Sequence, residues 1–96
     1  MPDKNKTVVV ARLTVKPGQE EAFVELASPL IDATRAEEGN GLYALYRSTQ
    51  NPAEFLFYEE YKDEAAFKAH LASAHFAAFA KASKAMTAGD VLIEQF

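Results

Sequence analysis

The 96-residue chain is long enough for one small folded domain, and 49% of its residues are hydrophobic and 25% charged. Its formal charge is −4, with no basic cluster that could neutralise a run of phosphates, which argues against nucleic acid as a partner. The absence of Cys excludes disulfides, thiolate nucleophiles and Cys-based zinc sites. Met1–Lys6 precede an apolar run too short for a signal peptide or a spanning helix, so we expect a cytoplasmic domain over residues 1–96 with no membrane partner.

The first part of the chain predicts a strand and then a long helix. Residues 7–15 are rich in β-branched side chains and end in the turn-forming sequence of residues 16–19. Apolar side chains then recur at helical spacing over residues 19–38, at Phe23, Leu26, Ala27, Leu30, Ile31 and Thr34. Pro29 lies inside this pattern and removes a backbone donor, so we expect the helix to kink or restart there, with Ser28 as its cap.

The middle of the chain predicts a β-hairpin. Glycines within residues 39–41 end the long helix, and strands are expected at 42–48 and 54–61. The turn at residues 50–52 would join these two strands.

The segment from Asp63 to Ala88 changes its helical phase. Asp63 can cap a helix that starts at Glu64. One helical face would then carry Phe67, His70, Leu71 and Ala74, whereas nearly the opposite face would carry Phe76, Phe79 and Met86. A single straight helix cannot bury both faces, so we expect a break at Ser73, which can cap a second helix. Residues 90–96 alternate well enough for a last strand.

The order β-α-β-β-α-α-β predicts an α+β, ferredoxin-like antiparallel sheet with its helices on one face. The strand over residues 54–61 is apolar at both parities, with Phe55 and Phe57 on one side and Leu56 and Tyr58 on the other. A solvated sheet face would be expected to carry alternating polar residues. We therefore expect a homodimer in which a second copy of the chain covers the face without helices.

Three stretches of sequence resemble the antibiotic biosynthesis monooxygenase family: Glu-Glu-Gly-Asn at residues 37–40, Phe-Tyr-Glu-Glu-Tyr-Lys-Asp-Glu at 57–64, and Phe-Lys-Ala-His-Leu-Ala-Ser-Ala-His-Phe at 67–76. The likeness runs from the first strand nearly to the C-terminus. It implies a dimeric α/β barrel in which two sheets pack face to face. It also implies an enzyme that oxidises an electron-rich phenol, anthrone or quinol with molecular oxygen, without flavin, haem or metal.

Such a reaction needs a base, hydrogen-bond donors for an oxyanion, and apolar walls. His70 is the predicted base or proton shuttle, because imidazole titrates near neutral pH and the helical pattern turns this residue towards the core. Glu59 shares its parity with Phe57 and Tyr61, and it could orient that imidazole or accept a proton itself. The residues predicted to bind the substrate are Asn40, Tyr43, Phe57, Tyr61, His75 and Phe76.

Each of these residues also has a structural interpretation. His70 could be a satisfied core histidine, His75 a helix-start residue and Glu59 a salt-bridge partner. Tyrosines in strands often pack with a solvated hydroxyl, and Asn40 could cap the end of the long helix.

The sequence predicts neither a metal nor another cofactor. His70 and His75 are five residues apart, which would separate them by about 140° around a continuous helix. The haem-degrading relatives use an Asn on the first strand, a Trp at the end of the third strand and a His on the last helix. The corresponding residues here are Ala11, Tyr61 and Ala80, which disfavours haem degradation.

Three classes of function stay open at the level of sequence. The first is a monooxygenase for a small apolar or aromatic substrate. The second is an isomerase or degradative enzyme for a small signalling molecule, because the resemblance extends to a branch that processes a phosphorylated quorum-sensing signal. For that ligand only Arg12, Arg35 and Arg47 offer guanidinium groups. The third class is a dimer that binds a small ligand without turnover.

Overall fold

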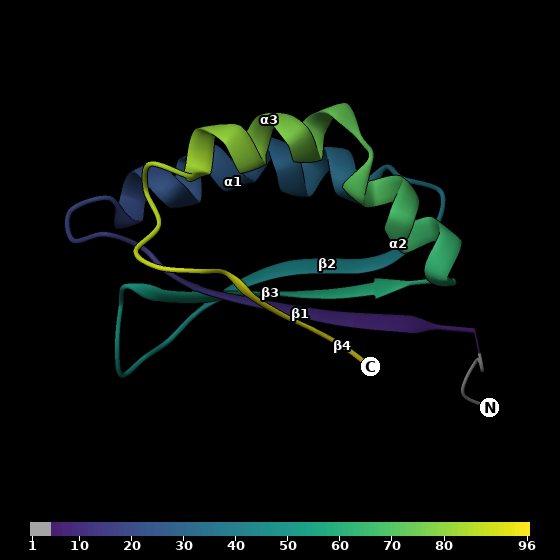
Figure 1. Ribbon diagram of the computed structural model, residues 1–96, viewed down its shortest axis with the longest axis horizontal. Helices are drawn as coiled ribbons and strands as arrows, with labels where there is room; N and C mark the ends of the chain where they lie inside the picture. The colour runs from purple at the N-terminus through teal and green to yellow at the C-terminus, as the bar shows by residue number, and fades with distance from the viewer. Residues whose placement is uncertain (1–4) are drawn as a thin grey trace.

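The computed structural model describes residues 5–96, so residues 1–4 of the N-terminal stretch considered above lie outside the described part of the chain. Strands β1 (Thr7–Thr14), β2 (Asn40–Arg47), β3 (Glu54–Tyr61) and β4 (Leu92–Gln95) form one antiparallel sheet in the order β2-β3-β1-β4. Helices α1 (Glu20–Arg35), α2 (Glu64–Leu71) and α3 (Ala74–Ser83) all cover the same face of this sheet (Figure 1). The predicted α+β, ferredoxin-like fold is confirmed. No helix within residues 5–96 has the length and apolar character needed to cross a membrane.

Strand parity decides which side chains enter the core. The odd-numbered residues of β1 and β3 face the helices and are buried, and α1 packs on them with the stripe that its spacing predicts. The rings of Phe23, Phe55, Phe57 and Phe79 meet in tilted or edge-to-face pairs with centroids 5.1–6.3 Å apart. The core therefore lies between the sheet and α1 and α3.

Helix α1 runs through Pro29 as one element, so the predicted restart at this position is wrong. Pro29 is on the exposed side of the helix, where solvent can satisfy the carbonyl that loses its partner. The helix ends at Arg35, three residues before the expected end, and a turn leads into β2 at Asn40. This turn passes very close to α2, because a Cβ at Gly39 would lie 2.3 Å from the Cβ of Ala66. Only glycine fits at this position.

The predicted break between the two later helices is confirmed. The Asp63 side chain accepts a hydrogen bond from the backbone N–H of Ala66 and caps α2. The Ser73 hydroxyl accepts one from the N–H of Phe76 and caps α3. Helix α3 ends at Ser83, earlier than expected, and the last strand is limited to Leu92–Gln95.

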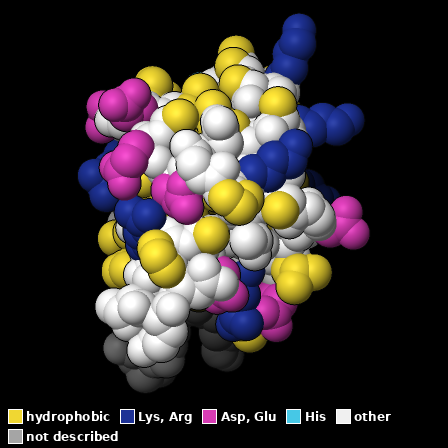
Figure 2. Space-filling view, turned by 90° about the vertical axis from the view of Figure 1, so that its left-hand side faces the viewer, with side chains coloured by type: hydrophobic (Ala, Val, Ile, Leu, Met, Phe, Trp, Pro, Cys, Tyr) yellow, Lys and Arg dark blue, Asp and Glu magenta, His cyan; other side chains and the backbone are white. Residues whose placement is uncertain are grey.

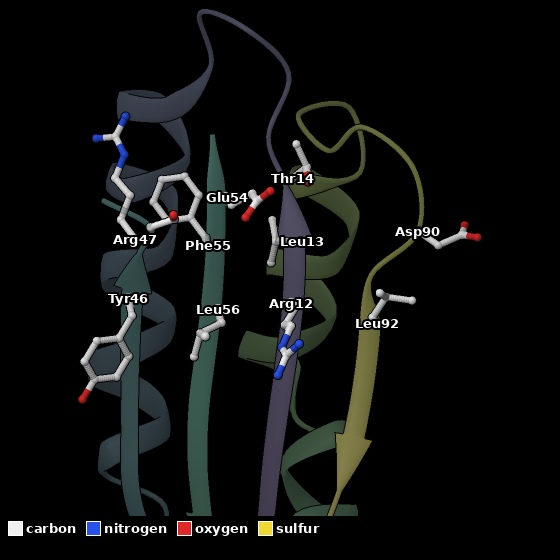
Figure 3. A pocket seen from close by; sticks show the side chains of 11 residues that line it. Arg12, Leu13, Thr14, Tyr46, Arg47, Glu54, Phe55, Leu56, Asp90 and Leu92 are labelled. Carbon is white, nitrogen blue, oxygen red and sulfur yellow. The ribbon is translucent and has the colours of Figure 1, made fainter. Parts of the chain in front are cut away.

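Among residues 5–96, no helix covers the opposite face of the sheet (Figure 1). A row of paired residues crosses it at one level: Tyr46, Leu56, Arg12 and Leu92. These four side chains help to line a depression of about 370 Å³ at the end of the sheet nearest the β2–β3 turn (Figure 3). Leu92 is 64% exposed and Phe96 is 70% exposed. The predicted face without helices is therefore present, and exposed apolar side chains lie on it beside the charged residues Arg12, Glu60 and Glu94.

Figure 2 shows the end of the molecule that is on the left in Figure 1. Hydrophobic, acidic and basic side chains are intermixed on this face.

Candidate active site

A cavity of about 240 Å³ lies between the sheet and the helices. Its walls are mostly apolar and come from all four strands, the three helices and the segment between α3 and β4. The polar residues that line it are Tyr43, Glu59, His70, Ser83, Lys84 and Thr87, and the first three have pKa values shifted by burial. An apolar cavity with a few convergent polar groups is the usual form of a small-molecule site.

Glu59 is brought to this cavity by the alternation of β3. It is only 5% exposed, although the neighbouring Glu60 points to the other face of the sheet. The Tyr61 hydroxyl donates a 2.7 Å hydrogen bond to Glu59 Oε1. Burial raises the pKa of Glu59 from its usual 4.5 to about 7, against the opposing effect of the Tyr61 hydrogen bond. Glu59 is therefore partly protonated near neutral pH and can donate or accept a proton.

His70 enters the cavity from α2, and its side chain is 1% exposed. Its ring lies against the rings of Tyr43, Tyr61 and Phe76, with centroids 5.1–5.5 Å away. Burial lowers the pKa of His70 below its usual 6.5, and the Glu37 carboxylate opposes that effect. The imidazole is therefore neutral at pH 7 and can accept a proton.

Tyr43 supplies a hydroxyl on the β2 side of the cavity. Its side chain is buried, and burial together with the charge of Glu59 raises its pKa, so it remains a neutral donor. Within residues 5–96, neither this hydroxyl nor Nε2 of His70 has a hydrogen-bond partner. Both groups are available to a bound molecule.

A carboxylate from the turn after α1 contacts the imidazole of His70. Glu37, in the turn after α1, places its Oε2 2.9 Å from Nδ1 of His70 and 2.5 Å from Nε2 of His75. The predicted 140° separation of the two histidines is wrong, because the helix breaks between them and both turn towards one carboxylate. One ligand atom from each of Glu37, His70 and His75 lies within 4.8 Å of the others, so the separation of the two histidines does not exclude a metal site.

The structure brings together five of the eight predicted site residues. Tyr43, Phe57, Glu59, His70 and Phe76 all line the cavity. Tyr61 does not line the cavity itself, but it contacts two residues that do, through its hydrogen bond to Glu59 and its ring contact with His70.

Asn40 and His75 do not line the cavity. The Asn40 amide donates to the backbone carbonyls of Leu42 and Glu60, where β2 bulges against β3. His75 is 28% exposed in its side chain and contacts Glu37. The suggestion that Glu59 orients the imidazole is also wrong, because Glu37 makes that contact.

Sequence reasoning missed Glu37 as a site residue. Its position in a turn gives no periodic signal, and the only hint was its place in the Glu-Glu-Gly-Asn stretch. The three arginines considered for a phosphorylated ligand are absent from the cavity walls, although Arg12 and Arg47 line the depression on the opposite face (Figure 3).

Comparison with known proteins agrees with this architecture. The family model described as "Antibiotic biosynthesis monooxygenase" matches residues 7–82. A Bacillus subtilis (strain 168) protein described as "Putative monooxygenase YcnE" is 40% identical over 77 residues, which cover 80% of this chain and 81% of the relative.

Two solved structures have the same fold. A conserved protein from Methanosarcina mazei Go1 matches with a TM-score of 0.94 and 30% identity, over 98% of this chain and 93% of that one. Rv0793 from Mycobacterium tuberculosis matches with a TM-score of 0.89 and 26% identity, over 95% and 92% of the two chains. The family match spans most of the chain and the structural matches span nearly all of it. The chain is therefore a member of the antibiotic biosynthesis monooxygenase family.

Proposed function

We propose that this protein is a cofactor-independent monooxygenase that oxidises a small electron-rich phenol or quinol with molecular oxygen. The observation that carries the proposal is the pairing of a neutral imidazole with a partly protonated carboxyl in one apolar cavity, at His70 and Glu59. The carboxyl pKa is raised and the imidazole pKa is lowered, and such shifted pKa values in one site are typical of acid–base catalysis.

The first step is removal of the substrate's hydroxyl proton. Nε2 of His70 accepts this proton, and the Tyr43 hydroxyl donates a hydrogen bond to the oxyanion that forms. The phenolate then gives one electron to oxygen, and the resulting radical and superoxide combine to form a bond between a ring carbon and oxygen. Apolar walls keep water away from the oxyanion and the reduced oxygen.

The second step converts the peroxide into product. Glu59 gives its proton to the peroxide anion. The resulting carboxylate then takes the hydrogen on the same ring carbon as a proton, while the O–O bond breaks. The leaving hydroxide receives the proton held by His70 and departs as water. One phenol and one oxygen molecule thus give one quinone and one water, and both residues regain their starting protonation states.

The size of the cavity limits the substrate. Apolar cavities of about 150 Å³ accept benzene. A volume of about 240 Å³ therefore suits one aromatic ring or two fused rings, with the hydroxyl directed towards Tyr43 and His70.

The partner proposed for the bare sheet face is a second copy of the chain. Exposed Leu92, Phe96 and Tyr46 lie on this face, and burying them would be favourable by about 25 cal/mol for each Å² of apolar surface. Sedimentation at micromolar concentration should find a dimer. The variant Leu92→Glu should dissociate the dimer. If the wild-type protein is instead a fully folded monomer, this proposal is wrong.

The experiment for the activity is oxygen uptake by metal-stripped protein with a panel of hydroquinones and naphthols at pH 6–8. His70→Ala should lower the rate about a hundredfold or more, the usual contribution of a positioned base. Glu59→Gln should lower the rate and also remove the decline expected above about pH 7, where the Glu59 carboxyl loses the proton it donates. If the wild-type rate equals the uncatalysed one while a quinol binds tightly, the protein is a binding protein and the monooxygenase proposal fails.

A further inference from the structure

We propose that Glu37 is a positioning residue, which acts by holding the His70 imidazole with its bare Nε2 towards the cavity. This inference rests on the proposed function in that the imidazole serves as the base. Glu37 belongs to the turn between α1 and β2, and its Oε2 lies 2.9 Å from Nδ1 of His70. His70 is fixed at this point by its own burial, because only 1% of its side chain is exposed.

The chemistry of the contact determines the tautomer. An ionised carboxylate can only accept hydrogen bonds, and a neutral imidazole has a single N–H. The proton of neutral His70 must therefore reside on Nδ1, facing Glu37. Nε2 is then the acceptor, and no protein group among residues 5–96 occupies it.

The same carboxylate also assists after proton transfer. Once Nε2 has accepted the substrate's proton, the imidazolium remains within hydrogen-bond distance of a negative charge. A base held by a carboxylate in this way is a recurring arrangement in nucleophilic and acid–base catalysis. The other titratable side chains that contact His70 are Tyr43, Tyr61 and His75. Both tyrosines stay neutral because their pKa values are raised.

His75 extends the Glu37–His70 contact to the protein surface. Its Nε2 lies 2.5 Å from the same Glu37 oxygen, and 28% of its side chain is exposed. This second contact restrains the carboxylate from the solvent side. A purely structural interpretation of the cluster is that Glu37 ties the turn to the break between α2 and α3. The two interpretations differ in whether the charge of Glu37 matters.

The test uses Glu37→Gln, which keeps the shape and one acceptor but removes the charge. Glu38→Gln is the matched control, because the adjacent Glu38 side chain is 95% exposed and forms a surface ion pair with Lys62. His75→Asn removes the second contact and leaves the Glu37–His70 pair. All proteins are studied as the full chain with EDTA present, and circular dichroism verifies their folding.

Two measurements are made on each protein. Imidazole ¹⁵N shifts should show the Nδ1–H tautomer of His70 in the wild type, and the pKa of His70 should fall further in Glu37→Gln because the carboxylate raises it. For quinol oxidation, Glu37→Gln should lower kcat at least about tenfold with KM within about twofold, since Glu37 does not line the cavity. Glu38→Gln should change neither measurement.

Several results would overturn the proposal. One is an Nε2–H tautomer of His70 in the wild type. Another is a His70 pKa and a kcat that are both unchanged in Glu37→Gln. The third is a loss of kcat in His75→Asn as large as that in Glu37→Gln, with the tautomer and pKa of His70 unaltered. If the wild type oxidises no quinol while the ¹⁵N results are as expected, the proposed function fails and the positioning of His70 by Glu37 stands.

Discussion

The two faces of β3 carry the same pair of side chains in opposite surroundings. On the inner face, Tyr61 donates a 2.7 Å hydrogen bond to Glu59, and on the outer face Tyr58 donates a 2.8 Å hydrogen bond to Glu60. Each pair consists of residues two apart on one strand, which places both side chains on the same side of the sheet. Chemical identity and local geometry are therefore nearly matched, and the surroundings differ.

The surroundings shift the pKa values of the two carboxyl groups, Glu59 and Glu60, in opposite directions. Burial raises the pKa of Glu59 to about 7. On the outer face, the Lys6 ammonium lies 2.7 Å from Glu60 and, with the Tyr58 hydroxyl, lowers the pKa of Glu60. One strand thus presents a proton donor to the cavity and a stable anion to the opposite face. Reactivity here is produced by the depth of burial more than by residue type.

Glu59→Gln should have the largest effect on the pH dependence of stability. The pKa of Glu59 is about 7 in the folded protein and near 4.5 in the unfolded chain, so the unfolded chain loses its proton first as pH rises. The free energy of unfolding of the wild type should therefore fall by up to about 3 kcal/mol between pH 4.5 and about 7 on account of this group. Glu59→Gln should lack that fall.

Urea denaturation of both proteins at matched concentration across this pH range measures the difference. Glu60→Gln provides the control on the opposite face. Parallel stability curves for wild type and Glu59→Gln would show that Glu59 is solvated in solution.

Sequence periodicity predicts part of the contrast between the two faces of β3. Strict alternation in β3 placed Glu59 with Phe57 and Tyr61, and it placed Leu56 and Tyr58 on the other face. The change of helical phase between Phe67 and Phe79 likewise predicted a break, and Ser73 located it because serine commonly caps a helix start. These inferences depend only on neighbours along the chain.

The contacts that sequence could not supply join distant segments. Glu37 meets His70 across 33 residues, and this distance in sequence leaves no periodic trace. Asn40, predicted to bind the substrate, does not line the cavity for a related reason. At the bulge between β2 and β3 its amide donates to two backbone carbonyls. The restart at Pro29 failed because the exposed side of α1 tolerates a lost hydrogen bond.

Tyr61→Phe should have an intermediate effect. The variant removes the donor to Glu59, and a hydrogen bond to a charged group contributes about 1.5–3 kcal/mol. The free energy of unfolding at pH 8 should fall by about this amount. The fall should shrink below about pH 7, where Glu59 is protonated and its hydrogen bond with the Tyr61 hydroxyl no longer involves a charged group. Tyr58→Phe is the matched control on the outer face, and an equal loss in the two variants would remove the contrast between the faces.

Glu60→Gln should have the smallest effect, because its partner Lys6 is 44% exposed in its side chain and exposed ion pairs contribute about 0–1 kcal/mol. Since the pKa of Glu60 is lowered, its contribution is present above the usual carboxyl pKa and is lost as pH falls through the folded value. Added salt should diminish the contribution at pH 7, whereas the buried Glu59 should respond little. A loss of about 2 kcal/mol or more that persists in high salt would mean that Glu60 is desolvated in solution. Repeating the measurement at several protein concentrations would then decide whether a second copy of the chain covers it, because only association makes that loss depend on concentration.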